Sequence, residues 1–200
     1  MNALFDSFSF RSRLQEQVQA AVDAVAVLTD AELVDGTTSD VADRLFKAHL
    51  PDLPRLDPVG ITKSTEMAHT ESRPVYGFGA ATASATMPKT SVVAFYVPFT
   101  GEPKWFEAIP SQAIGDRPRG LLQETSIKLF VPRGTKSAKE VHREFLALLE
   151  RVSDILKALA EEREDAKSRA TEALCLAIDD EKARREQDRE FMDELPYPYR

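Results

Sequence analysis

The spacing of apolar residues predicts two helices in the first quarter of the chain. Residues 8–34 have apolar side chains three or four positions apart, which is the period of an amphipathic helix. Gly36 follows the last of them, as a helix stop does. A second, shorter helix is predicted from about residue 38 to residue 49, before Pro51. The periodic positions are Leu14, Val18, Val22, Val25 and Leu28 in the first helix, and Val41, Leu45 and Phe46 in the second.

The pattern changes to that of β-strands after residue 90. Residues 91–99 (SVVAFYVPF) are β-branched and aromatic, and residues 105–109 (WFEAI) form a second, short candidate strand. Residues 121–132 alternate from Thr125 on, so that Ile127, Leu129 and Val131 share one face. Residues 51–90 are rich in Pro, Ser, Thr and Gly and are predicted to be mainly loop. We expect two to four antiparallel strands.

The last quarter of the chain predicts one long helix. Residues 137–192 contain no Pro or Gly, and Ser137 with Glu140 matches the capping box that starts a helix. Apolar residues then follow in alternating steps of four and three, which is a heptad seam. Farther on, alanines at 166, 170, 173 and 177 replace them. One continuous helix, roughly 80 Å long, is favoured over a hairpin that folds back near residues 161–170. The heptad positions are Val141, Phe145, Leu148, Val152, Ile155 and Leu159.

These elements predict an α+β fold with N-terminal helices, a small antiparallel sheet and a long C-terminal helix. Strands and helices do not alternate along the chain, which argues against a doubly wound parallel sheet. The expected organisation is a helical segment (1–50), a β-rich body with a loop (51–136), the long helix (137–193) and an extended tail (194–200).

Composition narrows the class of protein. The chain has 200 residues, 42% of them hydrophobic, which is enough for a packed core. Its net charge of −7 opposes a general affinity for nucleic-acid phosphates. A single cysteine, Cys175, excludes an intrachain disulfide. Because no apolar run is long enough to span a bilayer and no signal peptide is recognisable, we expect a cytoplasmic protein that does not contact membranes.

The sequence predicts no catalytic residue, no metal ligand and no cofactor. The three histidines lack ligand spacing, and no nucleophile elbow is present. The carboxylates of residues 179–182 lie on a predicted helix rich in both charge signs, where a solvated face is the simpler interpretation. The GFGAA stretch at 77–81 lacks the third glycine and the Lys-Ser/Thr pair of a phosphate-binding loop.

A basic and aromatic cluster near residues 104–136 has two interpretations. The only Trp follows residues 100–103, which we expect to form the turn of a hairpin. Cations and the ring together could hold a phosphate-bearing ligand or a nucleic-acid strand. The alternative, solvated turn cations beside a core Trp, is favoured. The candidate binding residues are Lys104, Trp105, Arg117, Arg119 and Arg133.

The heptad seam also has two interpretations. It could dock within the chain against the 8–34 helix, which has a comparable apolar stripe. It could instead pair between chains, in a homo-oligomer or with a partner protein. The six heptad residues given above are therefore candidate interface residues.

The order of several short motifs is similar to that of a known domain. The motifs are VPFTGE at 97–102, Phe106, Pro110-Ser111, the turn at 118–120, the strand 127–131 and a long helix with Glu140, Phe145 and Leu149, followed by Ala177-Ile178. Over roughly residues 50–200 the chain resembles the N-terminal, non-catalytic domain of bacterial phage-defence proteins. Those proteins usually continue into a segment similar to restriction-endonuclease-like (PD-(D/E)xK) nucleases. Residues 161–170 (EEREDAKSRA) depart from the pattern.

The resemblance implies a non-enzymatic accessory, sensor or adaptor subunit of a bacterial defence system. The positions of the nuclease segment would follow residue 200, so no catalytic residue is transferred to this chain. We expect the long helix to dock on a separate effector, such as a nuclease or an ATPase. The alternative hypothesis is a ligand- or nucleic-acid-binding domain that uses the 104–136 cluster.

Overall fold

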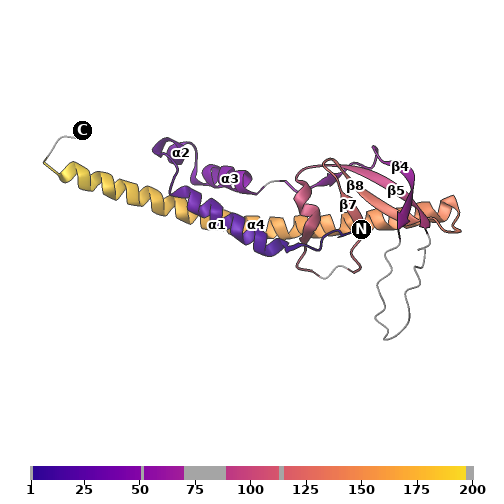
Figure 1. The fold of residues 1–200 in the computed structure, drawn as a ribbon. Coiled ribbons are helices and arrows are strands. Elements are labelled where there is room, and N and C mark those ends of the chain that lie inside the picture. The colour runs from indigo at the N-terminus through magenta and orange to yellow at the C-terminus, as the bar shows by residue number, and fades with distance from the viewer. Residues whose placement is uncertain (1, 51, 70–88, 113–114, 197–200) are drawn as a thin grey trace, which may run out of the picture. The chain divides into compact units, whose positions relative to one another are not determined.

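The computed structural model describes residues 2–50, 52–69, 89–112 and 115–196. It has the predicted α+β fold class, with N-terminal helices, an antiparallel sheet and a long C-terminal helix, α4 (Ala138–Glu194) (Figure 1). The chain forms two compact units. The first consists of Met1–Asp6, Pro54–Ala108 and Ile114–Leu156, and the second of Ser7–Leu53, Ile109–Ala113 and Lys157–Arg200. The helix α4 thus contributes its beginning to the first unit and the rest to the second.

A six-stranded antiparallel sheet organises the first unit. Its central strand is β5, which pairs along one edge with β8 and along the other with β4 and β3. Beyond β8 follow β7 and then β1. The strands are β1 (Asn2–Ala3), β3 (Arg55–Leu56), β4 (Thr62–His69), β5 (Lys89–Thr100), β7 (Arg119–Leu122) and β8 (Ser126–Pro132). Gly120 of β7 allows close strand contact, because a Cβ atom there would lie 2.9 Å from the Lys128 carbonyl oxygen.

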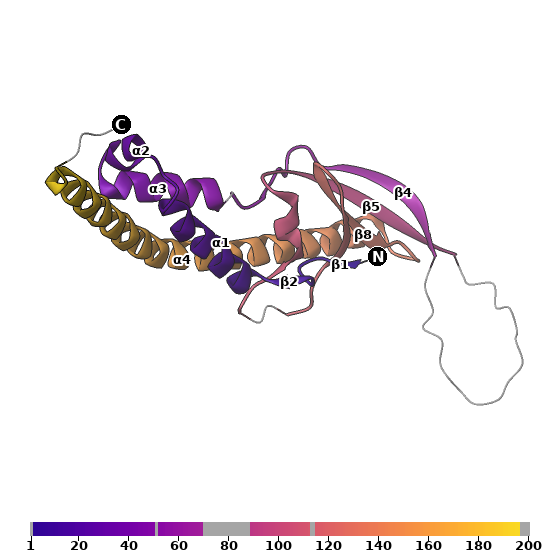
Figure 2. The ribbon, with the colours of Figure 1, turned by 60° about the vertical axis from the view of Figure 1, so that its left-hand side comes forward.

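One face of this sheet packs on the beginning of α4. Ile127, Leu129 and Val131 are buried on the predicted shared face of β8. The ring of Phe95, opposite Leu129 in the register, stacks on the ring of Phe145 with centroids 3.9 Å apart. Figure 2 shows the sheet lying along this part of α4 (Figure 2). The heptad seam therefore begins as a sheet-binding stripe.

The strand predictions need two corrections. The segment 51–90, predicted to be mainly loop, contains β3 and β4. The described side chains of β4 are exposed or half-exposed, so its sequence lacks the apolar alternation that reveals a strand, and its pairing with β5 decides its structure. Residues 105–109 are not a hairpin strand. A 3₁₀ helix, η1 (Pro103–Glu107), precedes the two-residue β6 (Ala108–Ile109), and the central strand pairs elsewhere.

The aromatic residues of η1 belong to the core of the first unit. Gly101, with φ 96°, lets the chain leave β5 in a conformation that a side chain would disfavour. Trp105 and Phe106 are then fully buried, and the Phe106 ring lies 4.8 Å from that of Phe99 and 5.9 Å from that of Phe5. Burial of these large rings, more than hairpin pairing, fixes this segment.

Three short helices and the rest of α4 form the second unit, together with the short strand β2 (Phe8–Ser9). The predicted 8–34 helix is interrupted: α1 spans Phe10–Val25 and α2 spans Asp30–Val34. The cause is a capping box in which Thr29 and Glu32 exchange hydrogen bonds and start a new helix. Gly36, with φ 95°, does end this region as predicted.

The second predicted helix is confirmed. Helix α3 spans Thr38–His49, and a Thr37–Asp40 capping box fixes its start. The capping box predicted for α4 is also present, since the Ser137 amide donates to Glu140 at 2.7 Å. These local hydrogen bonds explain why helix starts are legible in the sequence.

Helices α1 and α3 lie along the later part of α4 (Figures 1 and 2). The buried positions of α4 there recur every four residues at Ala170, Leu174 and Ile178. The predicted alanine stripe is only partly correct, because Ala173 is exposed and Leu174 takes the buried place. The other buried residues of this unit include Leu14, Ala21 and Val25 of α1, and Val41, Leu45 and Phe46 of α3.

Two arginines of α4 bind carbonyl oxygens where other helices end. Arg163 donates to the carbonyl of Leu50, the residue after α3, at 3.1 Å. Arg185 donates to the carbonyl of Leu28, beyond the end of α1, at 2.7 Å, and pairs with Asp30 at 2.6 Å. Only 17% and 18% of the two side chains are exposed. Cations at helix C-termini complement the helix dipole and satisfy free carbonyls.

We expect Phe145→Ala to lower the free energy of unfolding by about 3–5 kcal/mol, because it removes a buried ring and leaves a cavity beside Phe95. Leu146→Ala is the matched control, since Leu146 is 47% exposed on the next position of the same helix. That change should stay within about 0.5 kcal/mol. Urea unfolding of the full chain measures both. Equal effects of the two variants would contradict the packing of the sheet on α4.

We expect Arg185→Ala to loosen the connection between α1 and α2, because the Leu28 carbonyl and Asp30 lose their partner. Arg184→Ala is the control. Arg184 is adjacent and more exposed, at 58%, and it pairs with Glu181 and Asp188 within α4 itself. Amide hydrogen exchange should speed up at residues 26–34 in the first variant and stay unchanged there in the second. Unchanged protection in both would argue against the arginine contact.

Candidate functional site

The structure separates the predicted basic and aromatic cluster into buried and exposed parts. Trp105 is 1% exposed, so its ring is not available to stack on a ligand, and that part of the prediction is wrong. The ammonium of Lys104 lies 5.4 Å from the Trp105 ring centroid and 3.8 Å from the Glu102 carboxylate. Arg117 pairs with Asp6. The favoured interpretation, turn cations beside a core Trp, agrees with this geometry.

The other two arginines of the cluster, like Arg117, lie on the surface. The side chains of Arg119, in β7, and Arg133, just after β8, are both exposed. They supply positive charge without an accessible Trp ring beside them. The binding role predicted for these cations therefore stays a prediction, without the Trp105 ring as a stacking surface.

The heptad seam is occupied within the chain. Five of its six side chains are at most 7% exposed, and Leu148 is half-buried. A side chain that is already packed meets a partner only if the chain opens there, so this burial argues against the interface predicted at these positions. The five buried residues are Val141, Phe145, Val152, Ile155 and Leu159.

The outer face of the sheet has a polar and aromatic cluster that the sequence analysis missed. Strand register places Ser64, Tyr96, Lys128 and Phe130 on the face opposite Phe95. Glu66, on the same face, lies at the centre: its carboxylate accepts from Lys128 at 2.6 Å and from the Tyr96 hydroxyl at 2.8 Å. The Lys128 ammonium lies 5.1 and 5.2 Å from the Tyr96 and Phe130 ring centroids.

The contacts of this cluster shift the pKa values of Glu66 and Lys128. The hydrogen bond from Lys128, followed by that from Tyr96, lowers the pKa of Glu66 below its usual 4.5. The same carboxylate raises the pKa of Lys128. Because Glu66, Tyr96 and Lys128 lie on β4, β5 and β8, the network joins three strands. Its charges are mutually satisfied, so we assign it to sheet stability. The sequence signal for this cluster is the set of polar and aromatic positions that alternate with the apolar ones along each strand. An analysis of apolar periodicity does not reveal which of these positions lie opposite one another across strands.

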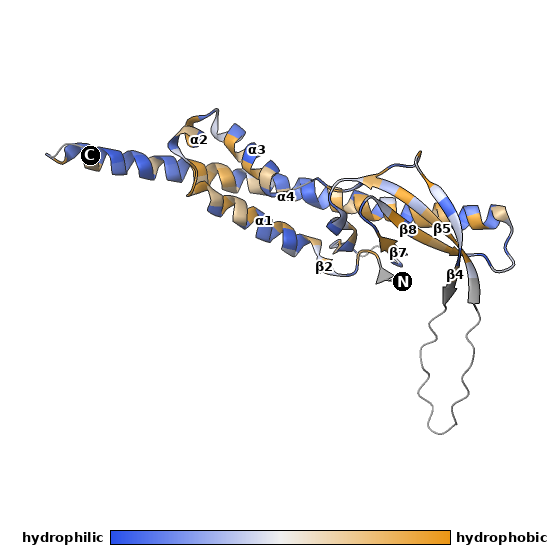
Figure 3. Cartoon of the chain, turned by 45° about the horizontal axis from the view of Figure 1, so that its top comes forward, coloured by the Kyte–Doolittle hydropathy of each residue, from blue (hydrophilic) through white to orange (hydrophobic). Residues whose placement is uncertain are grey.

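The end of α4 has a different surface. Arg185 is the last half-buried residue of the helix, and every residue from 186 to 196 is exposed. We call residues 186–196 the distal arm. Three of its side chains are large and apolar: Phe191, Met192 and Leu195 are 63%, 46% and 39% exposed. Phe191 and Met192 lie in the last turn of α4, and Leu195 directly follows its end at Glu194. Figure 3 shows that most residues of this end of α4 are hydrophilic (Figure 3).

The charges of the distal arm are predominantly acidic. Residues 186–194 include five carboxylates and one guanidinium, Arg189, so the segment has a net charge of −4. Just before it, Arg184 and Arg185 bind Glu181 and lower its pKa to about 2. An exposed apolar group ringed by carboxylates is the chemistry that an apolar groove with a basic rim would complement.

The described residues contain no group of three or more His, Cys, Asp or Glu side chains placed to hold a metal ion. None of the described helices combines the length and the apolar character that crossing a bilayer requires. The GFGAA stretch lies outside the described residues. Comparison with models of known families, with curated proteins and with solved structures finds no match in any of the three.

We expect Glu66→Gln to remove a pH-dependent part of the stability. The pKa of Glu66 is lower in the folded chain, so its contribution is complete above the unfolded value near 4.5 and is lost as pH falls through the folded value. The difference in unfolding free energy between wild type and variant should therefore shrink between about pH 6 and pH 3. Glu124→Gln is the control, because Glu124 is exposed between β7 and β8. Its difference in unfolding free energy from the wild type should stay constant over this pH range. A constant difference for Glu66→Gln would contradict the network.

Proposed function

We propose that this protein is a non-enzymatic accessory or adaptor subunit that docks through the distal arm of α4 onto a separate effector protein. One observation supports this most directly. Phe191 and Met192 are 63% and 46% exposed at the end of a helix whose preceding turns are covered by the chain's own α1–α3 region. Burying such side chains is worth about 1.5–3 kcal/mol each.

The shape of the arm supports recognition of a helix in a groove. Its residues continue a 57-residue helix, so they need no separate nucleation of helical structure. A partner that binds a preformed helix has a smaller ordering cost than one that must fold a loose segment. The docking element is thus the end of the helix, while the heptad seam holds the chain's own core.

Charge supports a different protein, rather than a second copy of this chain, as the partner. The arm has a net charge of −4 over residues 186–194, so two parallel copies would repel each other. An effector with an apolar groove flanked by Lys and Arg would match it. The resemblance to the non-catalytic domain of phage-defence proteins supports a cytoplasmic bacterial defence system as the setting, with a nuclease or an ATPase as the effector.

We expect the double variant Phe191→Ser/Met192→Ser to lose a partner that the wild type retains when the full chain is purified from its native cells. Leu146→Ser, another exposed apolar residue of α4, should retain it. Mass spectrometry identifies the partner, and sedimentation gives the stoichiometry. Raising the salt concentration should weaken the complex, because the acidic rim is solvent-exposed.

Four results would contradict the proposal. The wild-type chain could sediment alone as a monomer, or the double variant could retain the same partner. A homodimer lost in the double variant would assign the arm to self-assembly. A complex that dissolves on nuclease treatment would instead support the alternative, a nucleic-acid-binding function through the exposed Arg119 and Arg133.

A further inference from the structure

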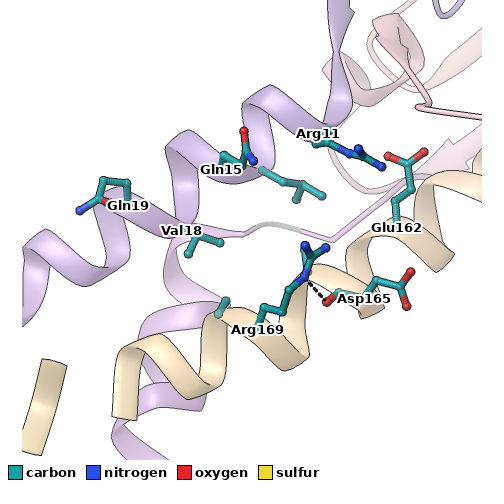
Figure 4. A pocket seen from close by; sticks show the side chains of 10 residues that line it. Arg11, Gln15, Val18, Gln19, Glu162, Asp165 and Arg169 are labelled. Atoms are coloured by element: carbon teal, nitrogen blue, oxygen red, sulfur yellow. Dashed lines mark hydrogen bonds between the residues drawn. The ribbon is translucent and has the colours of Figure 1, made fainter. Parts of the chain in front are cut away.

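A pocket of about 470 Å³ lies between α1 and α4 inside the second unit. Five lining residues come from each helix, and its volume falls in the range of about 300–1,000 Å³ of small-molecule sites. None of them belongs to the distal arm. Figure 4 shows the pocket from close by (Figure 4). The lining residues are Arg11, Leu14, Gln15, Val18 and Gln19 from α1, and Glu162, Asp165, Ala166, Arg169 and Ala170 from α4.

The space exists because small residues of α4 face α1. Ala166 and Ala170 occupy positions where the preceding part of the helix has Ile155 and Leu159. Opposite them, Leu14 is buried and Val18 is half-buried, so the pocket has an apolar floor. A larger side chain at residue 166 would fill it. The change from leucine and isoleucine to alanine, visible in the sequence, therefore has a structural consequence.

The rim of the pocket has charges of both signs. Figure 4 shows Arg11 reaching from α1 toward Glu162, and Arg169 pointing from α4 toward α1. The Nε atom of Arg169 donates to the Asp165 carbonyl oxygen at 3.3 Å, which orients the side chain and leaves its two terminal nitrogens directed away from that bond. Two guanidiniums are thus available to an anionic group.

The two carboxylates of the rim, Glu162 and Asp165, differ in their contacts with the rest of the chain. Glu162 accepts from the amide and the hydroxyl of Ser111, at 2.5 and 3.0 Å, so its position is fixed. Asp165, by contrast, is exposed to solvent. The side chains of Gln15 and Gln19 add amide donors and acceptors.

We propose that this pocket binds a small zwitterion with an apolar side chain, in the class of a free α-amino acid or a dipeptide. The two guanidiniums, Arg11 and Arg169, would receive the ligand carboxylate. Asp165 and Glu162 would receive its ammonium group. The apolar side chain would lie on Leu14, Val18 and the two alanines.

Ligands with one charge fit this rim less well. A simple anion would lie beside two carboxylates, and a simple cation beside two guanidiniums, at the cost of like-charge repulsion. A wholly apolar ligand would remove water from the charged rim without replacing its hydrogen bonds. The balance of two positive and two negative side chains therefore specifies the zwitterion.

The test is calorimetric titration of the full chain with L-leucine and with leucyl-leucine, which together distinguish a free amino acid from a dipeptide. N-acetyl-leucine lacks the ammonium and leucinamide lacks the carboxylate, and each should bind at least about tenfold more weakly, a difference of about 1.4 kcal/mol. The titration needs no partner protein, so its failure would leave the proposed docking function standing, and the reverse also holds.

Two variants locate the binding. Ala166→Leu fills the floor and should abolish binding, whereas Ala173→Leu, on an exposed position of the same helix, should leave it unchanged. Arg169→Gln should weaken binding at least about tenfold, and Arg151→Gln, an exposed arginine outside the pocket, should not. Circular dichroism checks folding. If Ala166→Leu does not fold, the exposed Arg169 decides the question.

Three outcomes would overturn the proposal. The first is no measurable heat for either zwitterion at concentrations well above about 1 mM. The second is equal affinity for the acetylated or amidated analogue, which would remove the zwitterion class. The third is unchanged affinity in Arg169→Gln, which would place binding elsewhere.

Discussion

The burial of one stripe of α4 supplies the core of both compact units. At the beginning of this stripe, Phe145 stacks on Phe95 of the sheet. Val152 and Ile155, about two and three helical turns farther along, are also buried. Farther along, Ala170, Leu174 and Ile178 are buried in the α1–α3 region. Without this stripe, neither the sheet nor the three short helices would have a complete apolar face to pack on. A 57-residue helix is held in water by such packing more than by its intrinsic propensity.

The stripe changes its chemistry along the helix, and each change has a separate consequence. Large side chains fit the sheet closely. The small side chains of Ala166 and Ala170 leave space between α1 and α4, and this space is the pocket. Arg163 and Arg185 replace apolar contact with hydrogen bonds to carbonyls at helix ends. After Arg185, no other part of the described chain covers the helix, and Phe191 and Met192 are exposed to solvent. Core, pocket and arm are thus successive segments of a single element.

The accuracy of the sequence predictions depended on how local the signal was. The start of α3 was predicted correctly, and so was the start of α4, which the sequence marks by a capping box of residues three positions apart. The strand face of Ile127, Leu129 and Val131 was also predicted, from its alternation. The break at Thr29 was available from the same kind of motif but was overlooked in favour of the longer apolar period.

Features that depend on distant residues were missed or misassigned. Nothing local in β4 reveals a strand, since its structure comes from pairing with β5. The burial of Phe145, Val152 and Trp105 argues against the predicted interface and the predicted stacking for the same reason: exposure depends on what the rest of the chain covers. The sequence by itself determined the helices, their caps and the continuity of α4, because backbone hydrogen bonds and side-chain period are local. Only the tertiary structure decided which apolar residues form the core, which form a pocket and which remain for a partner, because burial is a property of residues brought together from distant parts of the chain.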